Sequence, residues 1–457
     1  MVALISDASD AVPVAPVAAS DLAASLARLG ERTTRWAEAT GFKAEPEQVA
    51  LVPDESGGLA RVLVGWKPTE PLWAFGALPN QLPEGNYRLE GVPHDVVTAL
   101  TLGWALGGYE FVRYKTRKRG WARLMWPGDA DRSLVERLAD GIFLARDLIN
   151  TPTEHMGPAE LAAAGAQLAD KHQAFYRAVV GEGLLAENYP TIHAVGRAAA
   201  PGREPRLIDL RWGDPAAPKV TLVGKGVCFD TGGLDLKPAS GMRLMKKDMG
   251  GAATILGLAD AVMTAHLPVR LRVLVPAVEN AVAGNAIRPL DIVKTRKGLT
   301  VEIGNTDAEG RLILCDALAE ADSEKPTLLV DFATLTGAAR TALGPDLPAL
   351  FTNDDVLAED LLRAGTAQSA PLWRLPLWGG YRSMYKSKIA DLNNVSESPF
   401  AGAIQAALYL EDFVSSSTPW AHIDTFAWNA TSRPGRPEGG EALGLRAAYA
   451  MVAARFG

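Results

Sequence analysis

Val220-Thr221-Leu222-Val223-Gly224 is a short apolar run that leads into a glycine-rich loop ending near Gly251. The run has the length and composition of a buried strand. Small residues from Gly250 to Ala265 then have helical character, and a second apolar run, Leu271 to Val275, follows them. Strand, helix and strand in this order predict a βαβ unit with two parallel strands.

The same alternation continues on both sides of this unit. Further strands are predicted over 207–210 and 327–332, and further helices over 157–172 and 312–321. Alternation of this kind predicts an α/β fold whose mainly parallel sheet is flanked by helices. In such sheets ligands bind at the carboxyl ends of the strands, which is where we expect the functional residues.

The chain has 457 residues, which is too many for one hydrophobic core and predicts at least two domains. We expect a flexible tail, a small N-terminal α/β domain, a linker helix and a larger catalytic domain, over 1–19, 20–135, 136–150 and 151–457. The N-terminal domain is predicted to contain helices over 21–40 and 93–111 and strands over 48–52, 61–66 and 72–75.

Two acidic residues lie two positions apart in Asn305-Thr306-Asp307-Ala308-Glu309-Gly310-Arg311-Leu312. In extended backbone, Asp307, Glu309 and Arg311 would all face one small volume. Two carboxylates so close repel each other unless a cation lies between them, and a divalent metal is the simplest partner. The alternative is a solvated turn in which the acids and the arginine only pair with one another.

The glycine-rich loop supplies further polar side chains after the predicted strand, namely Lys225, Asp230, Lys237 and Asp248. Because these two segments and residues 334–337 follow strands of the predicted parallel sheet or lie in its joining loops, we expect all three to converge at the same sheet edge. Their four carboxylates would satisfy a pair of divalent ions. For Asp248 alone, a position just before a helix is favourable without any metal.

Several other chemistries are not supported by the sequence. The phosphate-loop pattern GxxxxGK followed by Ser or Thr is absent, and no HExxH pair or GxSxG elbow is present. The net charge of −7 does not suggest a broad nucleic-acid-binding surface. The two cysteines, of which Cys315 is expected in the core, provide no disulfide framework and fit a reducing cytoplasm. No apolar run reaches 18 residues, so no membrane span is predicted.

The octapeptide NTDAEGRL (305–312), together with VGKG, FDTGG, KP and KKDMGGAA between 223 and 253, resembles the leucyl aminopeptidase (cytosol aminopeptidase) family. The resemblance covers the chain from about Arg146 onward and is dense from Val220 to Gly337. Thr231 departs from it, because the family more often has serine there. The N-terminal third resembles the family only in size and position.

The resemblance implies a two-metal exopeptidase that binds Mn or Zn, with Mg or Co as alternatives. Asp230 and Glu309 would contact both ions, Asp307 one of them, and Lys225 and Asp248 the other. A lysine binds a metal only as the neutral amine, so the metal has to displace its proton.

The resemblance also implies roles for two basic side chains and for the substrate pocket. Lys237 would stabilise the oxyanion, and Arg311 would hold a bicarbonate that accepts a proton from the attacking water. The alternative for both is a salt bridge to the neighbouring acids. The residues matching family positions that bind substrate are Met245, Asn305, Thr334, Leu335 and Gly337. Plain core packing is the alternative for Met245 and Leu335.

The function implied is removal of an N-terminal leucine or another neutral residue from peptides, by water activated between two metals. The resemblance further implies a cytoplasmic homohexamer. The alternatives are a hexameric scaffold or nucleic-acid-binding regulator that retains the fold, and a narrow dipeptidase. His422 and Asp424 lie in a predicted strand near the site and are candidates for supporting the metal ligands.

Overall fold

The computed structural model describes residues 3–117 and 119–457. The chain forms two compact units, which are described separately. The smaller is Met1–Phe143 with Asn429–Glu438, and the larger is Leu144–Trp428 with Gly439–Gly457. The boundary at 143/144 lies inside helix α6 (Arg132–Asn150), which contains the stretch expected as a linker helix.

The smaller unit contains a six-stranded sheet with the order β1-β6-β5-β2-β4-β3. Every neighbouring pair is parallel except β3 and β4. The strands are β1 (Leu4–Ile5), β2 (Val12–Val17), β3 (Val49–Pro53), β4 (Leu59–Gly65), β5 (Gly85–Leu89) and β6 (Ala122–Met125).

Residues 1–19 were predicted to form a flexible tail. This prediction is wrong for the residues that form β1 and β2, and residues 1–2 lie outside the described part of the chain. Strand β2 is an inner strand of the sheet, and Val14, Ala15 and Val17 are buried. Proline counts against an inner strand because it lacks an N–H donor. Here Pro13 is in register only with β5 and Pro16 only with β4, so neither proline is paired on both sides.

Two other predictions in this unit need correction. The single helix expected over 21–40 is two helices, α1 (Leu22–Leu29) and α2 (Glu31–Ala39), separated by Gly30 at φ 96°. The strand expected over 72–75 is wrong, because Pro71 starts the short helix α3 (Pro71–Ala74). The remaining helices are α4 (Leu78–Gln81) and α5 (Val97–Gly107), the latter after a 3-10 turn at His94–Val96.

The larger unit is built on a nine-stranded sheet with the order β16-β15-β18-β14-β9-β11-β8-β7, and β10 also pairs with β11. The central pairs β18/β14, β14/β9, β9/β11 and β11/β10 are parallel, as predicted. The strands are β7 (Phe175–Val180), β8 (Arg206–Trp212), β9 (Lys219–Gly224), β10 (Gly226–Asp230), β11 (Arg270–Asn280), β14 (Leu328–Ala333), β15 (Ala349–Thr352), β16 (Trp373–Arg374) and β18 (Trp420–Asp424).

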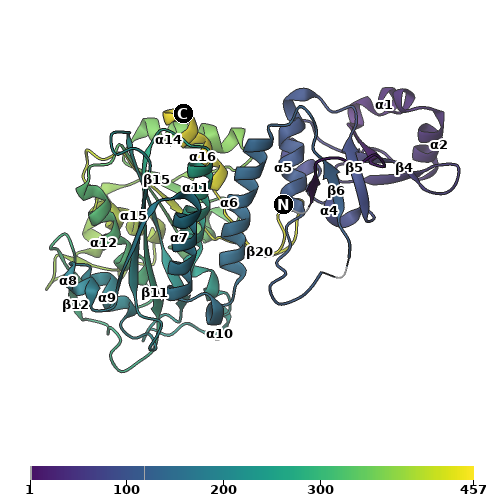
Figure 1. Ribbon diagram of the computed structural model, residues 1–457. Coiled ribbons are helices and arrows are strands. Elements are labelled where there is room, and N and C mark those ends of the chain that lie inside the picture. Colours follow the sequence, from purple (N-terminus) through teal and green to yellow (C-terminus); the bar gives the residue numbers. More distant parts are fainter. Residues whose placement is uncertain (1–2, 118) are drawn as a thin grey trace. The chain divides into compact units, whose positions relative to one another are not determined.

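Helices cover both faces of this sheet (Figure 1). Helices α7 (Pro158–His172), α11 (Gly250–Thr264) and α16 (Leu445–Phe456) pack on one face, and α9 (Pro190–Gly196), α12 (Glu309–Ser323) and α15 (Gly402–Glu411) pack on the other. The other helices are α8 (Gly183–Ala186), α10 (Ala239–Met242), α13 (Gly337–Leu343) and α14 (Asp355–Ala367). Short strands β12 (Ile292–Lys294), β13 (Thr300–Glu302) and β17 (Leu392–Asn393) form a separate sheet, and β19 (Trp428–Asn429) and β20 (Gly439–Gly440) have two residues each.

Close packing of α11 on the sheet fixes the loop between β9 and this helix. A Cβ atom at Gly224 would lie 2.7 Å from the Cα of Ala252, and one at Gly251 would lie 2.1 Å from the carbonyl oxygen of Phe332. Side chains at these positions would therefore push the helix away from β9 and β14. Within the described residues, none of the helices combines the length and apolar composition that crossing a bilayer requires.

Candidate active site

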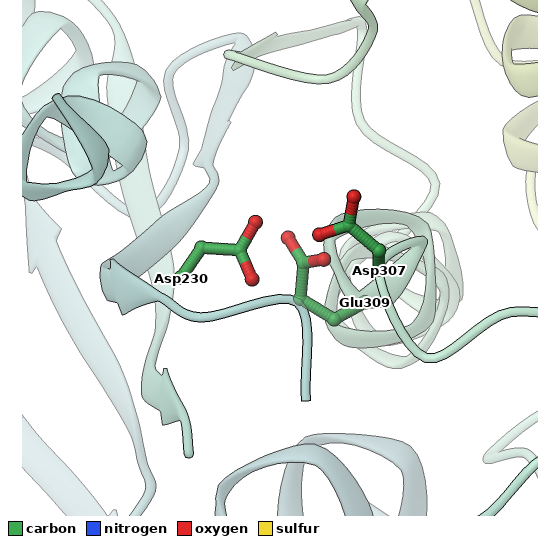
Figure 2. A group of neighbouring side chains, drawn as sticks. All are labelled: Asp230, Asp307 and Glu309. Carbon is green, nitrogen blue, oxygen red and sulfur yellow. The ribbon is translucent and has the colours of Figure 1, made fainter. Parts of the chain in front are cut away.

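The two predicted segments meet at the carboxyl ends of the central strands. Lys225 directly follows β9, and Asp230 is the last residue of β10. Asp248 lies in a 3-10 turn (Met245–Met249) that leads into α11, and Glu309 is the first residue of α12. Figure 2 shows the carboxylates of Asp230, Asp307 and Glu309 turned toward one another. One oxygen from each carboxylate lies within 4.8 Å of one oxygen of each of the other two.

The local backbone differs from the expected extended segment. Asp307 lies in a turn, whereas Glu309 and Arg311 are in the first turn of α12. Arg311 therefore does not join the carboxylate cluster, because residues two apart on a helix point in different directions. Its Nη1 donates to the carbonyl oxygen of Asn394 at 2.6 Å, and its guanidinium lies 6.0 Å from the ring centre of Tyr409. Among the described residues it has no ion pair to either acid.

Two lysines lie among the acids. The Nζ atom of Lys225 is 2.8 Å from Asp248 Oδ2 and 2.9 Å from Glu309 Oε1, and it donates to the carbonyl oxygen of Thr334 at 3.0 Å. Burial by itself lowers the pKa of Lys225, but the nearby carboxylates outweigh burial and raise it above its ordinary value. Without a metal, Lys225 is therefore held as the ammonium ion.

Lys237 bridges the other two acids, since its Nζ atom is 2.8 Å from Asp230 Oδ2 and 2.5 Å from Asp307 Oδ1. Burial lowers its pKa, but the charges and hydrogen bonds of Asp230 and Asp307 together outweigh burial, so the pKa is raised overall. The alternative predicted for Lys237, a salt bridge to the neighbouring acids, is therefore observed in the structure.

Two of the carboxyl groups have pKa values above their ordinary values. Burial, followed by the charge of Asp230, raises the pKa of Asp307 to about 6 and that of Glu309 to about 8. Asp307 Oδ1 and Glu309 Oε1 are buried and accept no hydrogen bond from the described residues, although a lysine ammonium lies within ion-pair distance of each. Clustered oxygen ligands that repel one another fit a hard divalent cation, so the residues present suit a metal.

A cavity of about 410 Å³ opens beside this cluster. Of the residues predicted to bind substrate, Met245, Thr334, Leu335 and Gly337 line it. Asn305 is not among the lining residues. Its Oδ1 accepts from the N–H of Asp307 at 2.8 Å and its carbonyl oxygen accepts from Asn394 at 2.7 Å, so it stabilises the turn. A substrate contact by Asn305 stays a prediction.

The sequence reasoning missed residues that hold the two segments together. Thr306 Oγ1 donates to the carbonyl oxygen of Gly232 at 2.6 Å and accepts from the N–H of Asp235 at 2.8 Å. Asn280, the last residue of β11, donates to Asp230 Oδ1 at 2.9 Å and to the carbonyl oxygen of Thr306 at 3.1 Å. A polar residue at a strand end was the available signal for Asn280, whereas Thr306 offered none.

The two candidates on β18 have different surroundings. Asp424 lines the cavity and accepts from Leu335 N–H at 3.0 Å and Thr336 Oγ1 at 2.6 Å. His422 is fully buried away from the cavity lining, and its Nδ1 lies 2.6 Å from Asp331 Oδ1. Asp424 therefore orients residues that line the cavity, and His422 is a core residue. Cys315 is buried in the core, as predicted.

The cavity lining also includes residues that the sequence did not single out, among them Lys247, Arg340 and Phe426. Lys247 is 5% exposed, and burial lowers its pKa to about 8. Its position directly before Asp248 gave no sign of a cavity-facing side chain.

Comparisons with known proteins agree with this geometry. Residues 143–449 match the cytosol aminopeptidase family, catalytic domain, and residues 12–127 match the M17 aminopeptidase, N-terminal domain. A probable cytosol aminopeptidase from Roseiflexus castenholzii is 40% identical over 375 residues, covering 78% of this chain and 76% of the relative. Peptidase B from an Enterobacter species is 44% identical over 321 residues, covering 68% and 74%.

Solved structures give the same result. A cytosol aminopeptidase from Coxiella burnetii superposes with a TM-score of 0.95 at 48% identity, covering 99% of this chain and 98% of that chain. The bottromycin maturation enzyme BotP, in complex with Mn, superposes with a TM-score of 0.88 at 34% identity, covering 97% and 99%. The chain therefore belongs to the cytosol aminopeptidase family of metal-dependent aminopeptidases.

Proposed function

We propose that this chain is a leucyl-type metalloaminopeptidase that removes a neutral N-terminal residue, leucine foremost, from peptides in the cytoplasm. The observation that carries the proposal is the convergence of carboxylates from segments more than 70 residues apart, beside a cavity. Such a cluster costs free energy in the protein alone, because burial and mutual repulsion raise the pKa of Asp307 and Glu309. The cost is recovered when cations bind.

The site has enough ligands for two divalent ions, Mn or Zn in our proposal with Mg or Co as alternatives. The residues that would hold them are Lys225, Asp230, Asp248, Asp307 and Glu309. When bound, such ions supply Lewis acidity and make a water molecule acidic enough to attack a carbonyl group near neutral pH. The raised pKa values of Lys225, Asp307 and Glu309 mean that loading the site releases protons, so affinity for metal rises with pH.

Lys237 is the group proposed to act on the substrate. Its side chain is 15% exposed and lines the cavity, and its ammonium stays charged at neutral pH because the adjacent carboxylates hold its pKa above the ordinary value. A fixed positive charge beside the scissile carbonyl would stabilise the oxyanion that develops there. Pro238 restrains the backbone directly after it.

Arg311 is proposed to hold a bicarbonate that takes up a proton during the reaction. Its Nε atom is buried and donates to no partner among the described residues, although Nη1 donates to Asn394. This leaves donor capacity for a small anion. We propose in addition that the active form is a homohexamer, which light scattering on the purified protein would test.

Hydrolysis of leucyl-p-nitroanilide by protein loaded with Mn or Zn tests the proposal. We expect Lys237→Ala to lower kcat by about 10²–10³-fold, the effect of losing one oxyanion donor, and Glu309→Ala to lower it further. Lys171→Ala is the matched control, since Lys171 is half exposed and pairs with Asp260, and neither residue lines the cavity. Undiminished turnover in Lys237→Ala or Glu309→Ala would contradict the mechanism.

A further inference from the structure

Lys247 places a cationic group in the cavity wall without a matching acid. The side chain is 5% exposed and its ammonium lies 4.6 Å from the ring centre of Phe426. Within residues 3–117 and 119–457, its Nζ atom has no ion pair and donates no hydrogen bond. The neighbouring Lys246 differs, because its Nζ atom donates to the carbonyl oxygen of Asn150 at 2.6 Å.

A second cation lies on the same aromatic ring. The guanidinium of Arg340 is 4.8 Å from the ring centre of Phe426, and Arg340 also lines the cavity. It stands three residues after Gly337 in α13, so the two residues share a face of that helix. No ion pair of Arg340 is formed with any described acid. The wall around Phe426 is therefore positively charged.

The nearest acids are already engaged elsewhere. Asp248 pairs with Lys225 at 2.8 Å and accepts from Thr334 Oγ1 at 2.7 Å. Asp424 accepts from the N–H of Leu335 and from Thr336 Oγ1. A nearly buried ammonium without a paired carboxylate is costly, and a ligand that brings its own carboxylate removes that cost.

The same cavity is shared with the carboxylate cluster. In the proposed reaction the cluster end of the cavity receives the substrate's α-amino group and scissile bond, so the first side chain points toward the remaining wall. That wall contains Met245, Leu335, Leu347 and Pro348, which suit an aliphatic stem, and Lys247, which suits an anionic end.

We propose that Lys247, assisted by Arg340, binds the side-chain carboxylate of an N-terminal glutamate or aspartate, which makes acidic peptides a second substrate class beside neutral ones. The inference rests on the proposed function for its catalytic consequence. Charge-assisted pairing in a partly buried pocket discriminates strongly between glutamate and its neutral isostere glutamine.

The test compares the aminocoumarin amides of glutamate, glutamine and lysine, hydrolysed at pH 7 by the Mn-loaded full-length protein. We expect Lys247→Met to lower the Glu:Gln ratio of kcat/KM at least tenfold and Lys247→Arg to restore most of it. Arg340→Ala should lower the ratio about threefold. Lys247→Glu should raise the Lys:Gln ratio, a gain that misfolding cannot produce. Lys246→Met is the matched control, whose Glu:Gln ratio should equal that of the wild type.

An unchanged Glu:Gln ratio in Lys247→Met, with the glutamine amide still cleaved, would overturn the inference and leave the proposed function intact. Calorimetric Kd values for glutamate and glutamine hydroxamates distinguish failure of this inference from failure of the proposed function. If the wild type cleaves no amide, the proposed function fails. A Kd ratio that then falls tenfold in Lys247→Met would still support binding by Lys247, and an unchanged Kd ratio would refute it.

Discussion

The larger unit contains two clusters of charged side chains that differ in balance. In the active-site cluster, four carboxylates share ion pairs with only two lysines, Lys225 and Lys237. Burial and like charge raise the pKa of Asp307 and Glu309 there. The geometry therefore favours the uncharged forms of Asp307 and Glu309 until a cation binds.

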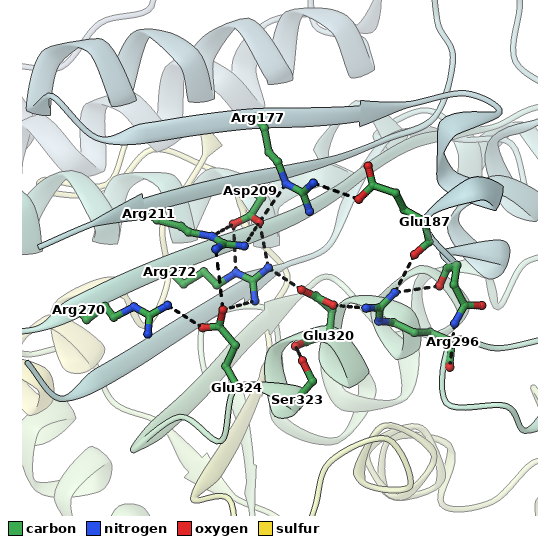
Figure 3. Close-up of polar contacts among 11 residues, drawn as sticks. Arg177, Glu187, Asp209, Arg211, Arg270, Arg272, Arg296, Glu320, Ser323 and Glu324 are labelled. Atoms are coloured by element: carbon green, nitrogen blue, oxygen red, sulfur yellow. Dashed lines mark hydrogen bonds and ion pairs between the residues drawn. The ribbon is translucent and has the colours of Figure 1, made fainter. Parts of the chain in front are cut away.

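The second cluster lies around Asp209 on β8, and in it arginines outnumber acids (Figure 3). Asp209 is 2.8 Å from Arg211 and 2.9 Å from Arg272, and Arg272 is also 2.7 Å from Glu320. Burial alone would raise the pKa of Asp209, but hydrogen bonds from Arg272 and Arg211 lower it to about 2. The other residues that complete the ion-pair network are Arg177, Glu187, Arg270, Arg296 and Glu324.

This difference in charge balance distinguishes a proposed metal-binding site from an ion-pair network that stabilises the fold. Both clusters are assembled from carboxylates and cationic side chains at one sheet. Where each acid is matched by planar guanidinium donors, the charges stabilise the fold. Where acids outnumber the cationic side chains and some carboxylate oxygens accept no hydrogen bond, those oxygens are free to bind a metal ion.

The largest expected effect comes from Glu309→Gln. We expect kcat to fall by at least about 10³-fold, because the substitution removes a proposed metal ligand. Metal-free stability should change in the opposite direction. The folded pKa of about 8 lies above the unfolded value of 4.5, so ionisation of Glu309 costs stability as pH rises through this range. At pH 8 the metal-free variant should unfold at a higher denaturant concentration than the wild type, and a lower midpoint would show that the cluster is not strained.

Metal addition should stabilise the protein by binding at the active-site cluster and not at the Asp209 cluster. Adding Mn to chelator-treated protein at about 100 times its Kd should raise the free energy of unfolding by about 2.7 kcal/mol, because the ion binds the folded state. Thermal unfolding of wild type, Glu309→Gln and Asp209→Asn would measure this. The gain should be retained in Asp209→Asn and largely lost in Glu309→Gln. An equal gain in all three proteins would place the ion elsewhere.

Asp209→Asn should destabilise the protein by about 2–3 kcal/mol at pH 7, as expected for a pKa lowered by about two units. The folded pKa of about 2 lies below the ordinary 3.8, so this stabilisation is present above pH 4 and is lost as pH falls toward 2. Urea unfolding between pH 2 and pH 7 should therefore show a shallower pH dependence in the variant. A wild-type-like slope would mean that the arginines do not hold the carboxyl group in its charged form.

The smallest effect is expected for Arg211→Gln. Arg211 is about one-third exposed, so water screens its pair with Asp209, and Arg272 remains in place. We expect a loss of about 0.5–1 kcal/mol that shrinks in 0.5 M salt, measured by urea unfolding. A loss as large as that of Asp209→Asn would show that the network depends on every member.

Local sequence patterns were enough to predict most of the fold and the types of residue proposed to bind metal. The runs near 220 and 271, with a helix between them, correctly predicted parallel strands, because a strand buried on both faces has to be continuously apolar. Asp230 ends strand β10 of that sheet, as expected, whereas Asp307 and Glu309 follow β13 of the separate three-stranded sheet and lie in the turn and helix start after it. The motif residues within 305–312 and 223–253 carried the family resemblance, which the family comparison confirmed.

Other features depend on partners that are distant in the chain. Residues 12–17 become an inner strand because β4 and β5 flank them, which outweighs the composition of a proline-containing segment. The turn at Asp307 is held by contacts from Thr306 to the 232–235 loop. The surroundings of Lys247 are formed by Phe426, which is far away in sequence and whose ring also lies beside Arg340. Burial and the absence of a counter-charge are properties of the assembled neighbourhood, so no local pattern encodes them.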